Sequence, residues 1–127
     1  MKKLLFCLVP VLAITACNKS GTGIICTQEL RMITLKVMTP AKSPVSLDSA
    51  YTIRVSNNER INYQHQMSVG TYVVLDDSYH HRLRRHEDQF RFIGWKNNQV
   101  VVNELYRIAG DQCHINKRSG ADSVIVQ

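Results

Sequence analysis

The sequence predicts an all-β protein, an antiparallel β-sandwich of about seven strands that follows an N-terminal leader segment. Three observations predict this fold. Apolar and polar residues alternate with period two in several segments, turn-forming residues separate those segments, and helical periodicity is almost absent. The length of 127 residues corresponds to one domain. A formal net charge of +6 is mildly basic, so we expect no nucleic acid among the partners.

The first half of the domain contains the clearest strand patterns. In the segment 30–37, Ile33, Leu35 and Val37 share one face, which is typical of a half-buried strand. The two prolines in the segment 39–46 indicate a loop after it. Further strands are expected at residues 51–55, residues 71–75 and, more weakly, residues 61–66.

The second half combines one irregular stretch with a long hairpin. Residues 79–88 have no strand pattern and could form a helical turn. Residues 90–108 alternate on both sides of Asn97-Asn98, and asparagine tolerates the left-handed backbone of a tight turn, so we expect a β-hairpin. Two short strands, residues 113–117 and 123–126, complete the expected sandwich.

The N-terminus has the layout of an export signal. Two lysines precede an apolar stretch that ends at Ile14, and Ile14-Thr15-Ala16-Cys17 resembles the lipobox of bacterial lipoproteins. We therefore expect Cys17 to be lipidated and the membrane to be a partner through this anchor. The expected organisation is a signal peptide at 1–16, the lipidated cysteine with a short tether at 17–25, and the β-sandwich at 26–127.

Two other interpretations of this segment stay open. Ordinary secretory cleavage after Ala16 favours a small residue two positions earlier, where Ile14 is large. Lipidation at Cys26 is disfavoured by the bulky Ile25. The lipid anchor implies a location in the cell envelope, periplasmic or surface-exposed. Asn18, in the place of an aspartate, favours the outer membrane over the inner one.

The cysteines indicate one disulfide bond. Of the four, Cys7 would leave with the signal peptide and Cys17 would take the lipid, so Cys26 and Cys113 remain. Exported proteins meet an oxidising compartment, and we expect this pair to be bonded. Two free thiols are the alternative. A nucleophile made of Cys113 and His114 is conceivable only in that case, because the disulfide would consume the thiol.

A basic stretch, residues 79–91, is the most prominent cluster of polar side chains. Its histidines stand five or six residues apart, and this spacing does not converge on a helix, so we expect no metal site. Arginine suits phosphate, sulfate and acidic glycans, which makes Arg82, Arg84 and Arg85 candidate contacts for an anionic ligand. A solvated loop without a ligand is the simpler interpretation.

No motif of an enzyme is present. The sequence lacks a Gly-x-Ser-x-Gly elbow, a His-Glu-x-x-His motif and a phosphate-binding glycine loop. We therefore expect no catalytic residues and no cofactor. The predicted function is that of a lipid-anchored envelope protein with a structural or binding role. The alternative is a binder of anionic glycan or lipopolysaccharide through residues 79–91, and envelope proteins or such glycans are the expected further partners.

Several segments resemble a known group of proteins. They read "CTQELRMITLKVMTPAKSPVSLDSAYTI", "YVVLDDSY", "FRFIGWKNNQVVVNELYRIAGDQCHI" and "SGADSVIV". They resemble small Gram-negative lipoproteins whose domain is similar to the carboxypeptidase-regulatory-like, transthyretin-like sandwich. The resemblance covers most of the mature chain and implies an Ig-like or transthyretin-like fold and an envelope location, with no catalytic residue. The sequence departs from the pattern at residues 39–42, where the group has an aspartate and a glycine in a tight turn.

Overall fold

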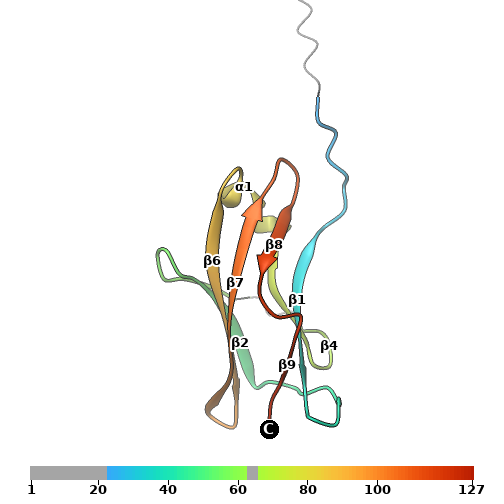
Figure 1. The fold of residues 1–127 in the computed structure, drawn as a ribbon, viewed down its shortest axis with the longest axis vertical. Coiled ribbons are helices and arrows are strands. Elements are labelled where there is room, and N and C mark those ends of the chain that lie inside the picture. Colours follow the sequence, from blue (N-terminus) through green and yellow to red (C-terminus); the bar gives the residue numbers. More distant parts are fainter. Residues whose placement is uncertain (1–22, 63–65) are drawn as a thin grey trace, which may run out of the picture.

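The computed structural model describes residues 23–62 and 66–127, which form two sheets packed face to face (Figure 1). The four-stranded sheet contains, in spatial order, β4 (Gln66–Ser68), β5 (Thr71–Asp76), β1 (Met32–Met38) and β9 (Ser123–Ile125). The five-stranded sheet contains, in spatial order, β3 (Glu59–Ile61), β2 (Ser49–Arg54), β6 (Glu87–Lys96), β7 (Gln99–Gly110) and β8 (Ile115–Ser119). A 3₁₀ turn, η1 (Asp77–Tyr79), and a single helical turn, α1 (His80–Leu83), connect β5 to β6.

The predicted all-β sandwich is confirmed, but the described part of the chain has nine strands instead of about seven. The weakly predicted segment 61–66 is the main reason for this difference in strand number. Strand β3 ends at Ile61 and β4 begins at Gln66, and these two strands belong to different sheets. The residues between them, 63–65, lie outside the described part. One edge segment was therefore expected where two short strands occur.

One pairing is parallel, although the sequence predicted an antiparallel sandwich. The last strand, β9, lies beside β1 and runs in the same direction, while every other pair of named strands is antiparallel in the described residues. Strand β8 belongs to the five-stranded sheet and β9 to the four-stranded one. The chain crosses between the sheets within residues 120–122 and joins the edge of β1 without reversing, so the pairing is parallel.

The core lies between the two sheets. Ile33, Leu35 and Val37 of β1 are buried and alternate with more exposed neighbours, which confirms the face predicted for this strand. Phe90 and Phe92 of β6 are buried opposite them in the same cluster. Each fully buried aliphatic or aromatic side chain contributes about 1.5–3 kcal/mol to folding. This apolar layer therefore supplies most of the driving force for folding.

The β6–β7 hairpin sets the length of the sandwich. Its turn at Asn97 and Asn98 has φ angles of 50° and 59°, the left-handed conformation expected for this asparagine pair. From Glu87 to Lys96, strand β6 spans about 30 Å at about 3.3 Å per residue step. In Figure 1 this hairpin turn lies at the bottom of the molecule, while α1 and the β7–β8 loop lie at the top. The two ends of the sandwich are therefore well separated.

A buried hydroxyl links the two sheets. The β1–β5 register shifts between Ile33 and Thr34, and this β-bulge leaves Val74 out of the ladder. The Thr52 side chain, on the opposite sheet, donates a 2.7 Å hydrogen bond to the carbonyl oxygen of Val74. Thr52 is fully buried. Because a buried carbonyl without a donor costs free energy, the Thr52 hydroxyl stabilises the core by supplying that donor.

Replacing Thr52 by valine should therefore destabilise the fold by about 2 kcal/mol, because the Val74 carbonyl stays buried and loses its donor. Thr52→Ser is the matched control: it keeps the hydroxyl and loses one methyl group, for a cost of about 1 kcal/mol. Urea denaturation measures both variants. A valine variant as stable as the wild type would show that the hydrogen bond contributes nothing.

Candidate functional site

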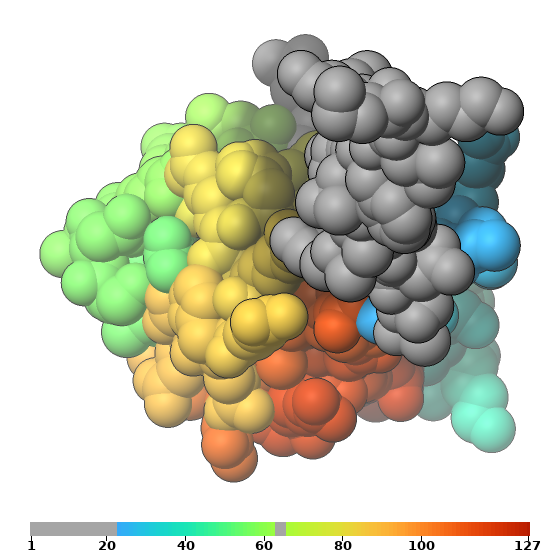
Figure 2. All heavy atoms as spheres, turned by 90° about the horizontal axis from the view of Figure 1, so that it is seen from above, coloured from blue at the N-terminus to red at the C-terminus, as the bar shows by residue number. Residues whose placement is uncertain are grey.

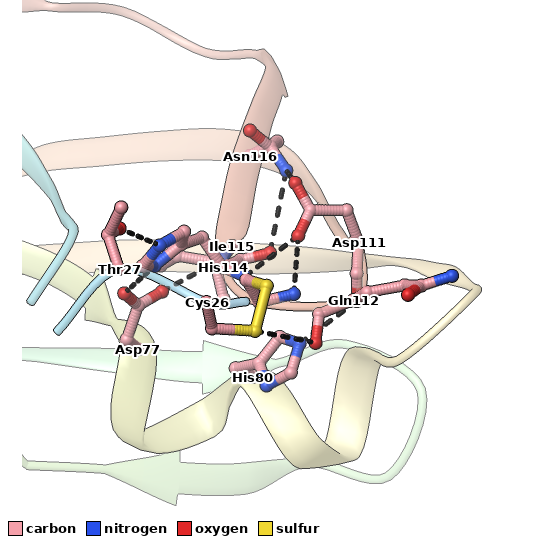
Figure 3. The surroundings of a disulfide bond; sticks show 10 residues. Cys26, Thr27, Asp77, His80, Asp111, Gln112, His114, Ile115 and Asn116 are labelled. Atoms are coloured by element: carbon pink, nitrogen blue, oxygen red, sulfur yellow. Dashed lines mark hydrogen bonds and ion pairs between the residues drawn. A yellow bond between two sulfur atoms is a disulfide. The ribbon is translucent and has the colours of Figure 1, made fainter. Parts of the chain in front are cut away.

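The predicted disulfide bond is present (Figure 3). Cys26 and Cys113 are joined with an S–S distance of 1.97 Å and a Cα–Cα distance of 5.3 Å, across a sequence separation of 87. Cys26 precedes β1, and Cys113 lies in the loop between β7 and β8. In the chain-entropy model a loop of this length stabilises the fold by about 4–5 kcal/mol. The bond also fixes the N-terminal segment against the end of the sandwich formed by the β7–β8 loop.

An aspartate turn shapes that loop and delays the next strand. One carboxylate oxygen of Asp111 accepts hydrogen bonds from the backbone N–H groups of Cys113, at 2.7 Å, and His114, at 2.8 Å. The other accepts from the Asn116 side chain at 2.7 Å. Because the Asp111 side chain takes these N–H groups, strand β8 begins at Ile115 and not, as expected, at Cys113. The same donors hold the pKa of Asp111 well below its usual range.

Asp77 and His114 form a clasp beside the disulfide (Figure 3). Asp77 Oδ2 lies 2.6 Å from His114 Nδ1, and His114 Nε2 lies 3.0 Å from Thr27 Oγ1. The same carboxylate accepts the backbone N–H groups of Arg31, at 2.7 Å, and Ile115, at 2.8 Å. Burial raises the pKa of Asp77, but the backbone hydrogen bond from Ile115 and the contact with His114 outweigh it and lower the pKa overall. Asp77 thus connects the N-terminal segment to β8.

The order hydroxyl, imidazole, carboxylate in Thr27, His114 and Asp77 is also that of a hydrolase triad. Sequence reasoning missed it, because these residues are far apart in the chain and stand in no motif. A triad needs a substrate cavity and donors for an oxyanion as well. What the geometry shows for the three residues is a structural link: Thr27 belongs to the N-terminal segment, and Asp77 also binds the backbone of Arg31 and Ile115, so the group holds that segment in place.

The structure separates Arg82 from the other two predicted anion contacts. Arg82 forms an ion pair with Glu59 of β3, and the hydroxyl of Tyr79 donates a 2.6 Å hydrogen bond to the same carboxylate. The Arg82 guanidinium lies 5.0 Å from the centre of the Tyr79 ring. These contacts tie α1 to the edge of the five-stranded sheet. Arg82 is therefore paired with a residue of this chain, although its side chain stays 45% exposed.

Arg85 lines a surface hollow of about 380 Å³ at the α1 end of the sandwich. The basic side chains in the lining are Arg85, His86 and Arg118, and all three are exposed. Arg118 lies on β8, and the sequence did not single it out, because only the pairing of β7 with β8 brings it near Arg85. The remaining lining residues are Glu87, Ala109, Gly110 and Asp111.

The acidic side chains that line the hollow have partners within the protein, whereas its arginines have none among the described residues. Glu87 is paired with Arg107, with Oε1 2.6 Å from Nε, and the Asp111 carboxylate is occupied by its three N–H donors. By contrast, the side chains of Arg85 and Arg118 make no hydrogen bond or ion pair with any residue in 23–62 or 66–127. The same is true of Arg84, which is not among the lining residues. Arg107 balances the charge of Glu87, and Asp111 keeps its charge while its oxygens are engaged. The two arginines of the lining, unpaired within the described residues, therefore leave an excess of positive charge, which favours an anion.

The backbone at Arg85 is held in an unusual conformation. Its φ angle of 62° lies in the left-handed region, which costs a non-glycine residue about 1–2 kcal/mol. Two hydrogen bonds to Gly110 fix it: Arg85 N donates to the Gly110 carbonyl at 3.0 Å, and Gly110 N donates to the His86 carbonyl at 3.2 Å. Such strained positions cluster at functional sites. The fold thus fixes the Arg85 backbone at the rim of the hollow.

Comparison with known proteins identifies no relative. No protein-family model matches this chain, and neither do any curated protein or any solved structure. Within the described residues, no group of three or more His, Cys, Asp or Glu side chains is placed to hold a metal ion. A functional conclusion therefore depends on the residues of this chain alone.

The two acidic side chains at this end should make stability depend on pH. The pKa values of Asp111 and Asp77 are lowered by folding, so the folded state binds protons less readily than the unfolded chain does. Their stabilisation is present above the ordinary aspartate pKa of about 3.9 and is lost as the pH falls below it. We expect Asp111→Asn to cost about 1 kcal/mol at pH 7 and much less at pH 2.

Urea denaturation at the two pH values measures this difference. Asp122→Asn is the charge-matched control, because the Asp122 side chain is 89% exposed and its ion pair with Lys117 lies on the surface. If Asp111→Asn lost the same free energy of unfolding at both pH values, the carboxylate would not be the source of the stabilisation.

Proposed function

We propose that this chain is a lipid-anchored β-sandwich of the cell envelope, with a binding or structural role and without catalytic activity. The observation that supports this most is the Cys26–Cys113 bond. A long-range disulfide is typical of an exported protein in an oxidising compartment. It also occupies the sulfur of Cys26, so that Cys17, in the sequence Ile14-Thr15-Ala16-Cys17, is the remaining cysteine that suits a lipid anchor.

The signal peptide and Cys17 lie outside the described residues, and their roles rest on the sequence pattern. None of the helices in the described part is long and apolar enough to cross a membrane. The anchor would therefore supply the membrane affinity. A single acyl chain binds a membrane only marginally, so stable attachment takes the several chains that a bacterial lipoprotein carries or an additional contact from the protein. The outer membrane is the favoured location, because Asn18 follows Cys17.

A second candidate function is the binding of an anionic glycan or lipopolysaccharide. The observation in its favour is the hollow lined by Arg85 and Arg118, whose guanidinium groups have no partner among the described residues. Phosphate, sulfate and carboxylate groups are the ligands that such side chains bind best. This candidate is compatible with the first, since an anchored sandwich can also hold a ligand.

Metabolic labelling with a fatty-acid analogue tests the anchor. The wild-type chain should take the label, and Cys17→Ser should lose it, because the variant lacks the sulfur to which the lipid attaches. Cys7→Ser is the matched control and should be labelled like the wild type, because Cys7 lies inside the expected signal peptide. Persistent labelling of Cys17→Ser would rule out the proposed anchor.

A further inference from the structure

The N-terminal segment leaves the domain at the end that holds the basic hollow. Cys26 is bonded to Cys113, which follows the hollow-lining Asp111 by two residues. In Figure 1 the first described residues run upward, away from the sheets, on the side of α1 and the β7–β8 loop. Figure 2 looks onto this end and shows the blue N-terminal residues together with the yellow residues around α1 and the red residues around β8. The disulfide makes this the exit point of the chain.

The expected tether is short relative to the sandwich. Nine residue steps lead from Cys17 to Cys26, and a flexible polar chain of that length has an average end-to-end distance of about 15–18 Å. Strand β6 alone spans about 30 Å. The tether therefore holds the exit point nearer to the lipid, on average, than the opposite end at Asn97 and Asn98. An anchored protein would keep the exit end closest to the lipid.

The exit end carries exposed arginines without partners in the described part of the chain, together with the exposed carboxylate of Glu29. Arg84, Arg85 and Arg118 are exposed and have no partner among the described residues, and His86 lines the same hollow. At the opposite end, the Lys96 ammonium group donates a 2.8 Å hydrogen bond to the carbonyl of Ser46, the hairpin turn is uncharged, and Lys42, in the loop between β1 and β2, is exposed. Free arginines are therefore concentrated where the tether begins.

We propose that this end of the sandwich lies against the membrane and that Arg85 and Arg118 bind the phosphate group of an anionic lipid there, an inference that rests on the lipid anchor proposed above. A guanidinium group donates two parallel hydrogen bonds to phosphate, and two such groups from different segments surround the hollow. Lipid is the favoured source of the phosphate because the anchor keeps the hollow within reach of many headgroups. Such tethering raises their effective concentration.

Nuclear magnetic resonance of the lipidated full-length protein in nanodiscs tests this. We expect the backbone amide signals of His86 and Gly110, which line the hollow, to shift when phosphatidylglycerol is added to phosphatidylcholine discs. The shift should shrink at high salt, because ions screen the contact. The double variant Arg85→Asn and Arg118→Gln should lose the shift, and asparagine at position 85 tolerates the left-handed backbone.

The control variant removes the same charge from another surface. Arg60 and Arg91 both pair with Ile53 on the face of the five-stranded sheet opposite the buried Thr52. The double variant Arg60→Gln and Arg91→Gln should keep the full shift. A shift that is absent in the wild type, or that persists without Arg85 and Arg118, would overturn the proposal. Equal loss in both double variants would also overturn it, because net charge alone would then explain the effect.

Two added probes identify the source of the anion. Heparin or inorganic phosphate is added to the protein in phosphatidylcholine discs. A response to either probe combined with no response to phosphatidylglycerol overturns the lipid proposal, and a response to heparin then favours the acidic glycan. Fatty-acid labelling of the same preparation keeps the two proposals apart. Unlabelled protein means that the anchor has failed, whereas labelled protein with an unresponsive hollow means that this inference alone has failed.

Discussion

The bond between Cys26 and Cys113 is the constraint on which the functional geometry depends. The chain before β1 has little to hold it in place, since Ile24, Ile25 and Leu30 are all more than half exposed. The disulfide, the Asp77–His114 clasp and the Asp111 turn fix this segment to the β7–β8 loop. They therefore decide at which end the chain leaves the sandwich, and which surface an anchor would place nearest the lipid.

Much of the fold could be predicted because the burial of apolar side chains, which contributes most to folding, leaves a period-two pattern in the strands. Ile33, Leu35 and Val37 behave as that pattern predicts. Strand β2 shows its limit: Tyr51 and Ile53 are the apolar residues, yet Thr52 is the one fully buried. The face of β2 that carries Ala50 and Thr52 packs against the core, where the Thr52 hydroxyl binds a carbonyl left over by a bulge in the other sheet. No local pattern records such a distant bulge.

The candidate site was less predictable, because its parts meet only through tertiary structure. The bond between Cys26 and Cys113 was predicted by counting the cysteines left after export and from the oxidising compartment of exported proteins. The structure confirms this bond. The sequence pointed to Arg85 as an anion contact because it stands in a basic stretch of the chain. The role of Arg118 required the β7–β8 register, and the engagement of Arg82 by Glu59 required the position of β3. The fold thus pairs one arginine of the basic stretch with an acidic residue and leaves another without a partner among the described residues.

The central claim is that the disulfide end of the sandwich faces the membrane. Paramagnetic relaxation from a spin label on lipid headgroups, measured for the lipidated full-length protein in nanodiscs, tests it most directly. The account predicts strong broadening of the amide signals of Gly110 and Gln112 and little effect on Asn97 and Asn98, at the far hairpin turn. Equal broadening at both ends, or stronger broadening of the hairpin turn, would contradict it.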